Sequence, residues 1–419
     1  MSAKKTRWII RYGTSAAALS AGLLCLSASR PAGAVTDFNP FATVDVSHSS
    51  NIFQLPDKQA LSPGASYEDT VTRAIAGLLA DFDWGPEKLA LNAQGSRLQY
   101  AQNDDLSHFE SMFGGKFDWL AGPVFSSTLN YSQARTITAP GATLSQDLEV
   151  QTDHVAGGSF RFLVTPRVRI DLEPGWHQLD SPLQLYPDFG YRETSAAGSL
   201  LYMGMAKLWS GLRFRYVDGS YHHIVGATRY NQKTAELTST YAVTNLTSFD
   251  FRAGYTWRNT SLVNPADATN PALGGLPGDL GSTSGFTGAI GLTRRLTVKT
   301  SVNVRAFREV SSYGAGANSY VSTGAEGGVN WAPDFRFTIG ANYRYAREDI
   351  DGLQAITGFA GRSDRINTSE LSVQYHALDW LSLRPYASRY TRSSNLARAS
   401  YNATIVGIDF TARLHPIKQ

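Results

Sequence analysis

The sequence predicts an all-β protein, an antiparallel up-and-down β-barrel that crosses a membrane. Three observations predict it: short and long connections alternate, apolar and polar residues alternate with a period of two, and tryptophans gather beside the short connections. Transmembrane barrels have short turns on the periplasmic side and longer loops outside. The pattern contains about 18 strands, with 16 to 20 as the compatible range.

The first 34 residues have the composition of a cleavable signal peptide. Basic residues between Lys4 and Arg11 precede an apolar stretch from Ala16 to Leu26, and Ala32-Gly33-Ala34 forms a cleavage site. The apolar stretch is too short for a spanning helix, and no later run reaches about 18 apolar residues. We therefore expect a signal peptide over 1–34, one barrel domain over 35–419, and a location in the outer membrane of a Gram-negative bacterium.

The basic charge of the full sequence comes from this leader. The formal net charge is +3, whereas residues 35–419 contain 33 basic and 35 acidic residues. The charge therefore gives no reason to expect nucleic acid as a partner. The single cysteine, Cys25, lies in the leader, which leaves no disulfide or thiolate metal site in the rest. No cofactor or metal is expected.

Period-two alternation defines the strands in chain order. Phe337, Ile339 and Tyr343 fall on one face of their segment, whereas Thr338 and Arg344 fall on the other. A soluble β-sandwich also alternates, but it would not carry so many long charged side chains at inward positions. The segment 68–84 also fits a helix, and the even strand count favours a strand. The expected strands cover 42–53, 68–84, 89–100, 107–119, 124–136, 150–164, 167–178, 190–205, 208–217, 229–242, 247–258, 284–293, 296–310, 320–331, 335–348, 366–377, 381–392 and 400–414.

The short connections and the tryptophans support the same arrangement. Tryptophans beside short turns, with others at the opposite strand ends, predict two aromatic girdles at the membrane interfaces. The longest loop, 259–283, is expected either to fold inward as a constriction or to extend outside. The predicted tight turns are 85–88, 121–123, 165–166, 206–207, 243–246, 294–295, 332–334 and 378–379, and the tryptophans beside them are Trp84, Trp119, Trp209, Trp331 and Trp380, with Trp176 and Trp257 at the opposite ends.

Alternation also predicts which charges face the lumen. Guanidinium groups suit solutes with carboxylates or phosphates, because one guanidinium can donate two parallel hydrogen bonds to such a group. The alternative is that these arginines pair with acids on neighbouring strands. Six are candidates for contact with an anion or a polysaccharide: Arg213, Arg252, Arg305, Arg336, Arg344 and Arg384. The full inward set adds Arg169, Arg215, Arg258, Lys299 and Arg413, against Asp171, Glu173, Glu236, Asp250, Glu326 and Asp409.

No local catalytic motif is present in the sequence. It contains no Gly-x-Ser-x-Gly elbow, no His-Glu-x-x-His and no phosphate-binding glycine-rich loop. The adjacent His222 and His223 fall in a predicted outside loop, where such a pair is usually solvated. We therefore expect no enzymatic activity.

Three segments resemble one family of outer-membrane proteins. They are the opening stretch from Val44 to Asp57, the region from Tyr191 to Tyr221, and Arg392-Ser393-Ser394-Asn395-Leu396 followed by Tyr401. They resemble the EpsL-like β-barrels associated with exopolysaccharide biosynthesis, within the β-barrel porin group. The resemblance implies a barrel that serves polysaccharide secretion, and it carries over no catalytic or binding residues. The chain departs from barrels that end on an aromatic residue, because five residues, His415 to Gln419, follow Leu414.

Three hypotheses for function follow. The first is export of an extracellular polysaccharide, with outer-membrane lipid, the polysaccharide, and periplasmic and inner-membrane secretion components as partners. The second is a general diffusion porin for small solutes, preferably anionic. The third is a barrel enzyme that trims the polysaccharide.

Overall fold

The computed structural model describes residues 35–58, 61–137, 149–180, 190–222, 228–262, 279–312, 319–351, 361–396 and 399–414. The predicted signal peptide, most of the predicted long loop 259–283 and the final five residues lie outside the described residues. The ends of that loop, 259–262 and 279–283, belong to strands.

The described chain forms a closed antiparallel barrel of eighteen strands, which confirms the predicted fold class. The segment that also fitted a helix is β2, a strand of 16 residues. The strands are β1 Val35–Ser49, β2 Asp69–Trp84, β3 Glu87–Tyr100, β4 His108–Ala121, β5 Phe125–Ile137, β6 Val150–Thr165, β7 Val168–Asp180, β8 Gly190–Met205, β9 Leu208–His222, β10 Thr228–Thr244, β11 Thr247–Leu262, β12 Asp279–Thr297, β13 Thr300–Ser312, β14 Ser319–Trp331, β15 Phe337–Asp351, β16 Arg362–Leu378, β17 Leu381–Ser394 and β18 Tyr401–Arg413.

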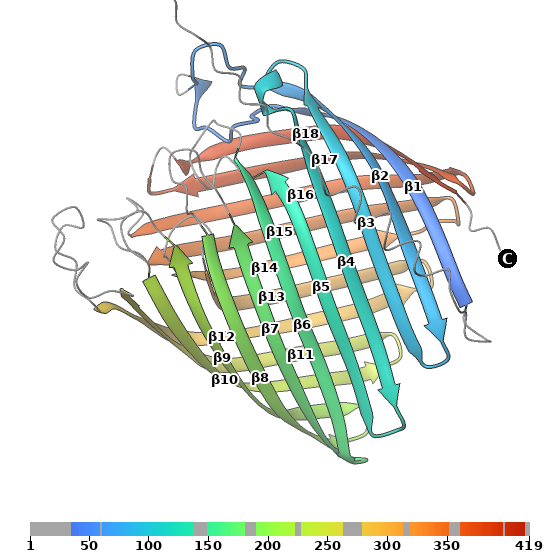
Figure 1. Ribbon diagram of the computed structural model, residues 1–419, viewed down its shortest axis with the longest axis vertical. Helices are drawn as coiled ribbons and strands as arrows, with labels where there is room; N and C mark the ends of the chain where they lie inside the picture. The colour runs from blue at the N-terminus through green and yellow to red at the C-terminus, as the bar shows by residue number, and fades with distance from the viewer. Residues whose placement is uncertain are drawn as a thin grey trace, which may run out of the picture.

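Each strand pairs with its neighbours in sequence, and β1 pairs with β18 to close the barrel. Figure 1 shows the strands inclined to the barrel axis, with the short turns at one end and the long connections at the other. A short 3₁₀ helix, Asp104–Leu106, lies in the connection between β3 and β4. Barrels of this strand number leave room for an aqueous channel.

One predicted tight turn is wrong. The pair Arg294-Arg295 lies within β12, and the turn follows at Val298-Lys299. Lys299, predicted to face the lumen, is therefore a turn residue. Its backbone N–H donates to the hydroxyl of Thr297 at 3.1 Å, which closes the turn locally. Two adjacent arginines resembled a polar turn, but in a strand they alternate between the two faces.

One tryptophan also departs from the predicted girdle. Trp209 lies opposite Met203, in register with inward-facing residues of β8 and β9. The guanidinium of Arg169 lies over its ring at 4.9 Å, so Trp209 faces the lumen. A tryptophan beside a turn thus predicts closeness to the membrane interface but not the face.

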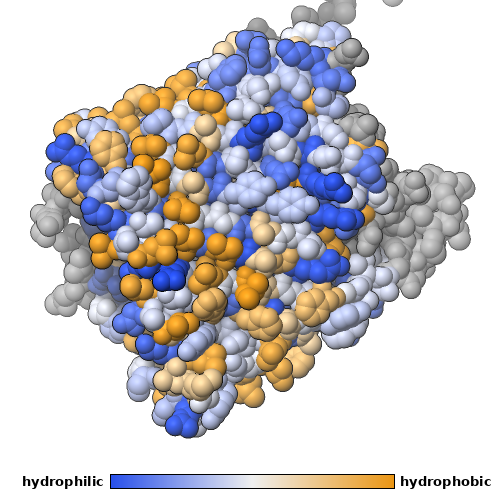
Figure 2. Space-filling model, turned by 180° about the vertical axis from the view of Figure 1, so that it is seen from behind, coloured by the Kyte–Doolittle hydropathy of each residue, from blue (hydrophilic) through white to orange (hydrophobic). Residues whose placement is uncertain are grey.

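The outer face of the barrel is apolar between its two ends. Leu371 is 54% exposed, and Leu237 and Val304 are each 48% exposed. Figure 2 shows apolar side chains over much of the back face, with hydrophilic ones denser on the side of the long connections. A closed barrel pairs its backbone groups internally, as a lipid environment requires. Such an apolar surface on a closed barrel is suited to lipid contact.

Candidate functional site

A network of ion pairs runs along the inner wall from β11 to β15. Arg305 pairs with Glu326 at 3.2 Å, and Glu326 pairs with Arg344 at 3.8 Å. Glu309 contacts Arg305 and pairs with Arg252 at 3.4 Å. Arg305, Glu326 and Arg344 lie directly opposite one another on β13, β14 and β15, so they project from the same face. Positive and negative groups therefore alternate across the wall.

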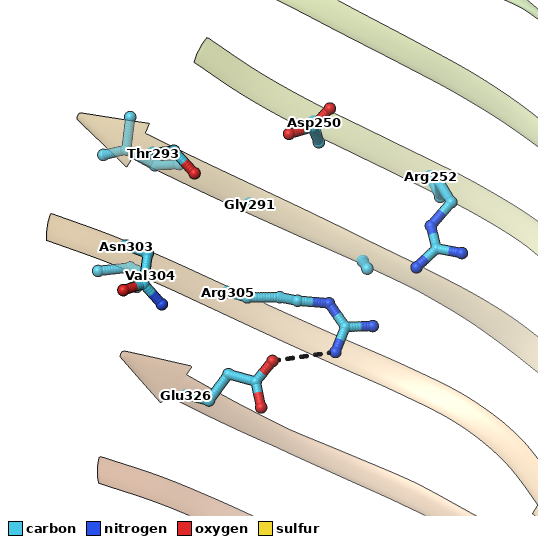
Figure 3. A pocket seen from close by; sticks show the side chains of 10 residues that line it. Asp250, Arg252, Gly291, Thr293, Asn303, Val304, Arg305 and Glu326 are labelled. Carbon is cyan, nitrogen blue, oxygen red and sulfur yellow. Dashed lines mark hydrogen bonds and ion pairs between the residues drawn. The ribbon is translucent and has the colours of Figure 1, made fainter. Parts of the chain in front are cut away.

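Small residues on neighbouring strands open a groove beside this network. Gly291 and Ala289 are inward on β12, between the charged faces of β11 and β13. Figure 3 shows Arg252, Arg305 and Glu326 reaching towards this space from three strands. We call the two adjoining pockets the inner-wall groove. One, of about 310 Å³, is lined by Asp250, Arg252, Thr293, Asn303, Arg305 and Glu326 among others. The second, of about 230 Å³, is lined by Asn303, Glu326, Asn342, Arg344, Thr368 and Glu370 among others.

Two amide side chains meet in this groove because a glycine separates them. Gly328 lies directly opposite Asn303 on one side and Asn342 on the other. A Cβ at Gly328 would lie 2.5 Å from Oδ1 of Asn342 and 2.8 Å from Oδ1 of Asn303. Any larger residue would push the amides away. Each amide can both donate and accept hydrogen bonds, as a sugar hydroxyl can.

The structure brings three of the six predicted contact residues together and separates the others. Arg252, Arg305 and Arg344 line the groove. Arg213 lies inward elsewhere, between Glu173 at 2.6 Å and Glu236 at 3.2 Å. The other two, Arg384 and Arg336, also lie away from the groove.

Arg384 lies inward on β17, where it pairs with Asp409 at 2.6 Å. Arg336 precedes β15, in the segment after β14, and is exposed with its guanidinium 5.3 Å from the Phe335 ring. It lies at the rim, because β15 begins only at Phe337.

The inner wall carries no basic excess, whereas the inward charges predicted from the sequence had one. Strand register adds many inward carboxylates, so among described residues the inward acids are at least as numerous as the bases. The added acids include Asp45, Asp69, Glu110, Asp118, Asp153, Glu193, Glu309, Glu348, Asp364 and Glu370, and the added bases include Arg73, Lys88, Lys116, Arg161, Arg362 and Arg392.

Sequence reasoning missed the amides and the small residues of the groove. Asn303 and Asn342 fall on the polar face of their strands in the alternation pattern, but only charged positions were considered as contacts. The described residues contain no group of three or more His, Cys, Asp or Glu placed to hold a metal ion.

A second built region lies at the end with the long connections. We call residues 50–58, 61–68 and 101–107 the mouth cap. Phe53, Leu55 and Leu106 of the cap form a buried cluster with inward residues of β2 and β3, and Leu106 is only 3% exposed. The predicted first strand ran to residue 53, but β1 ends at Ser49 and the chain turns over the mouth. This cluster draws the opening stretch of the family resemblance onto the inner edge of the barrel.

Buried polar groups fix the mouth cap. The carboxylate of Asp69 is fully buried and accepts backbone N–H groups from Ala101 and Gln102 at 3.0 Å and from Asn103 at 2.8 Å. The Tyr67 hydroxyl donates to the Leu55 carbonyl at 3.0 Å. Burial raises the pKa of Tyr67, so its hydroxyl keeps the proton that it donates.

Comparison with known proteins found distant structural similarity and no related sequence. No family model and no curated protein sequence matches this chain significantly. Among solved structures, OpdK of Pseudomonas aeruginosa with vanillate aligns at 11% identity and a TM-score of 0.46, covering 90% of this chain and 99% of that chain. The ferric-catecholate import receptor Fiu of E. coli K12 aligns at 11% identity and 0.45, covering 91% and 82%.

The siderophore receptor PirA of Pseudomonas aeruginosa aligns at 11% identity and 0.44, covering 91% and 81%. At these scores the likeness supports no inference about a solute or ligand. Among the described residues, no helix is long and apolar enough to span a membrane. The closed sheet, the apolar outer face and the charged inner face are the features of a barrel in lipid. The described part of the chain is an 18-stranded β-barrel of the outer membrane.

Proposed function

We propose that this barrel passes an extracellular polysaccharide across the outer membrane, without catalysing a reaction. The observation that carries the proposal is the inner-wall groove, in which amides, carboxylates and guanidinium groups lie side by side with balanced charge. A polymer rich in hydroxyl groups can exchange hydrogen bonds with each of these groups in turn. The family resemblance of three sequence segments points to the same class of substrate.

Balanced charge separates this proposal from its main alternative. A diffusion porin that prefers anions needs an excess of fixed positive charge along its lumen. Arg305 and Arg344 share Glu326, and Arg252 has Glu309, so their charges are offset locally. A diffusion porin remains the second candidate, because a barrel of 18 strands is wide enough for an aqueous channel.

The experiment measures secreted polysaccharide in cells that lack the chromosomal copy and carry a plasmid copy. The variant Asn303→Leu/Asn342→Leu removes the two amide groups from the groove without changing its charge, and we expect it to lower secretion. Asn130→Leu is the matched control, because Asn130 is an inward amide beside a glycine, Gly157, on the other side of the barrel. Unchanged polymer amount and length in the deletion strain would refute export.

Two further measurements separate the alternatives. Steady conductance at low voltage, with small solutes entering whole cells at equal rates with and without polymer, would favour the diffusion porin. Incubating the purified barrel with the polymer tests the enzyme hypothesis, since shortened chains would reveal cleavage. We further propose that periplasmic and inner-membrane secretion components deliver the polymer, which co-purification from crosslinked cells would test.

A further inference from the structure

A row of arginines crosses the outer surface near the mouth. Arg308 of β13 lies directly opposite Thr323 of β14, and Thr323 lies opposite Arg347 of β15. Arg347 in turn lies opposite Arg365 of β16, which lies opposite Ser393 of β17. Directly opposed residues share a face, and these alternate with residues that point into the lumen. We call these five residues the outer arginine row.

The depth of this row is set by tyrosines on the same face. Tyr343 and Tyr345 are outward and exposed, four and two residues before Arg347 on β15. Tyrosines on a barrel exterior mark the membrane interface. A strand rises about 3.3 Å per residue, so the row lies about 7 Å beyond Tyr345 along the strand. This is the depth of lipid headgroups, on the side of the long connections.

The row carries more positive charge than the protein itself offsets. Arg347 is paired with Asp349 at 3.0 Å. Arg308 donates to the Thr323 hydroxyl at 2.8 Å and to the Phe286 carbonyl at 3.1 Å, both uncharged acceptors. Within the described part of the chain, Arg308 and Arg365 have no ion-pair partner.

The direct opposition of Arg347 and Arg365 points to an anion. Like charges directly opposite each other on a sheet destabilise it. A phosphate between two guanidinium groups reverses the sign of this interaction, because each guanidinium binds it with two parallel hydrogen bonds. Strands lie about 4.8 Å apart, so Arg308 and Arg365 are roughly 14 Å apart, enough for two phosphate groups.

We propose that the outer arginine row binds the phosphate groups of phosphorylated lipids in the outer leaflet. The row faces outward above an apolar, lipid-facing surface, which favours a lipid headgroup over a free phosphate ion. The hydroxyls of Thr323 and Ser393 add donors on the same line. This proposal is independent of what passes through the lumen.

The test uses the purified barrel in a non-ionic detergent and a fluorescent lipopolysaccharide with intact phosphates as the probe. Each basic residue at an anionic membrane surface contributes about 1 kcal/mol, so Arg347→Gln/Arg365→Gln should weaken binding roughly 30-fold. Arg365→Gln alone should weaken it about 5-fold, which keeps the test usable if the double variant does not fold. Arg294→Gln is the control, because Arg294 is an outward, exposed arginine at the opposite end of the barrel.

Each outcome bears on the proposal. The expected weakening in the double variant, unchanged binding in Arg294→Gln, and no binding of the same lipid after its phosphates are removed would support it. Equal weakening by Arg294→Gln would show nonspecific charge attraction and overturn the proposal. Inorganic phosphate that competes at the same phosphate concentration would show an ion site and refute a lipid ligand.

Discussion

The alternation of faces can be tested at the middle of one strand. Leu371 is the tenth of the 17 residues of β16, points outward, and is 54% exposed. It lies between outward tyrosines, with Tyr375 towards the short turns and Tyr343 towards the mouth. An arginine on the lipid face near the bilayer midplane costs about 2–4 kcal/mol. Leu371→Arg should therefore lower the free energy of unfolding by about 3 kcal/mol, roughly 150-fold in the folding equilibrium.

The measurement is reversible unfolding in guanidinium chloride with the barrel inserted in phosphatidylcholine vesicles. Ser372→Arg is the matched control, since Ser372 is the next residue and faces the lumen opposite Tyr386. Its new side chain would remain in water, so we expect a change within about 1 kcal/mol. Equal losses in the two variants, or a larger loss in Ser372→Arg, would refute the assignment of faces on β16.

Three further predictions concern the cap, the groove and the orientation. Asp69→Ala leaves buried backbone N–H groups without an acceptor and should lower the free energy of opening the mouth cap by on the order of 3 kcal/mol. If neither the conductance nor the rate of proteolysis in the cap changed, this prediction would be contradicted. Gly328→Ala should weaken polymer binding about tenfold by displacing two amides, with unfolding unchanged as the control measurement. Ser62→Cys, at the end with the long connections, should react with an impermeant maleimide on whole cells, and Asp379→Cys, in a short turn, should react only after lysis. The label is specific because residues 35–419 contain no other cysteine. The reverse result would mean an inverted barrel.

The sequence predicts the strands well because their alternation is local. Facing lipid on one side and water on the other, each strand repeats the same period of two. Strand ends are less certain, since β1 begins at Val35, seven residues before its predicted start. The first residues after the predicted signal peptide resemble an unstructured terminus. Their place in the sheet depends on pairing with β2, which local pattern does not contain.

The turn after β12 is marked in the sequence by the threonine that precedes it. In three turns a threonine at the end of a strand accepts the N–H two residues later: Thr165 from Arg167 at 3.2 Å, Thr244 from Leu246 at 3.1 Å, and Thr297. Threonine hydroxyls stabilise such turns locally. The same pattern in the sequence predicts a turn directly after Thr297.

The groove and the cap depend on residues far apart in sequence. Whether the charges on the wall offset one another depends on the register of many strands. For example, Glu309 on β13 reaches Arg252 on β11 across the intervening β12. The cap was hidden for another reason. Phe53 and Leu55 continue an alternating pattern, so the sequence alone predicts that the strand runs past Ser49. Only their burial against β2 and β3 shows that the strand has ended.

The mouth cap also links the segment after the first strand to the last strand, which has a consequence for the order of assembly. The Asn51 amide donates to the Asn402 carbonyl of β18 at 2.9 Å, and the Ser50 N–H donates to the Thr404 carbonyl at 2.9 Å. These bonds need the last strand to be in place beside the first. The attachment of the mouth cap to the wall is thus completed by the same event that closes the sheet. Before the last strand is in place the cap is held only against β2 and β3, and the bonds to β18 complete its attachment.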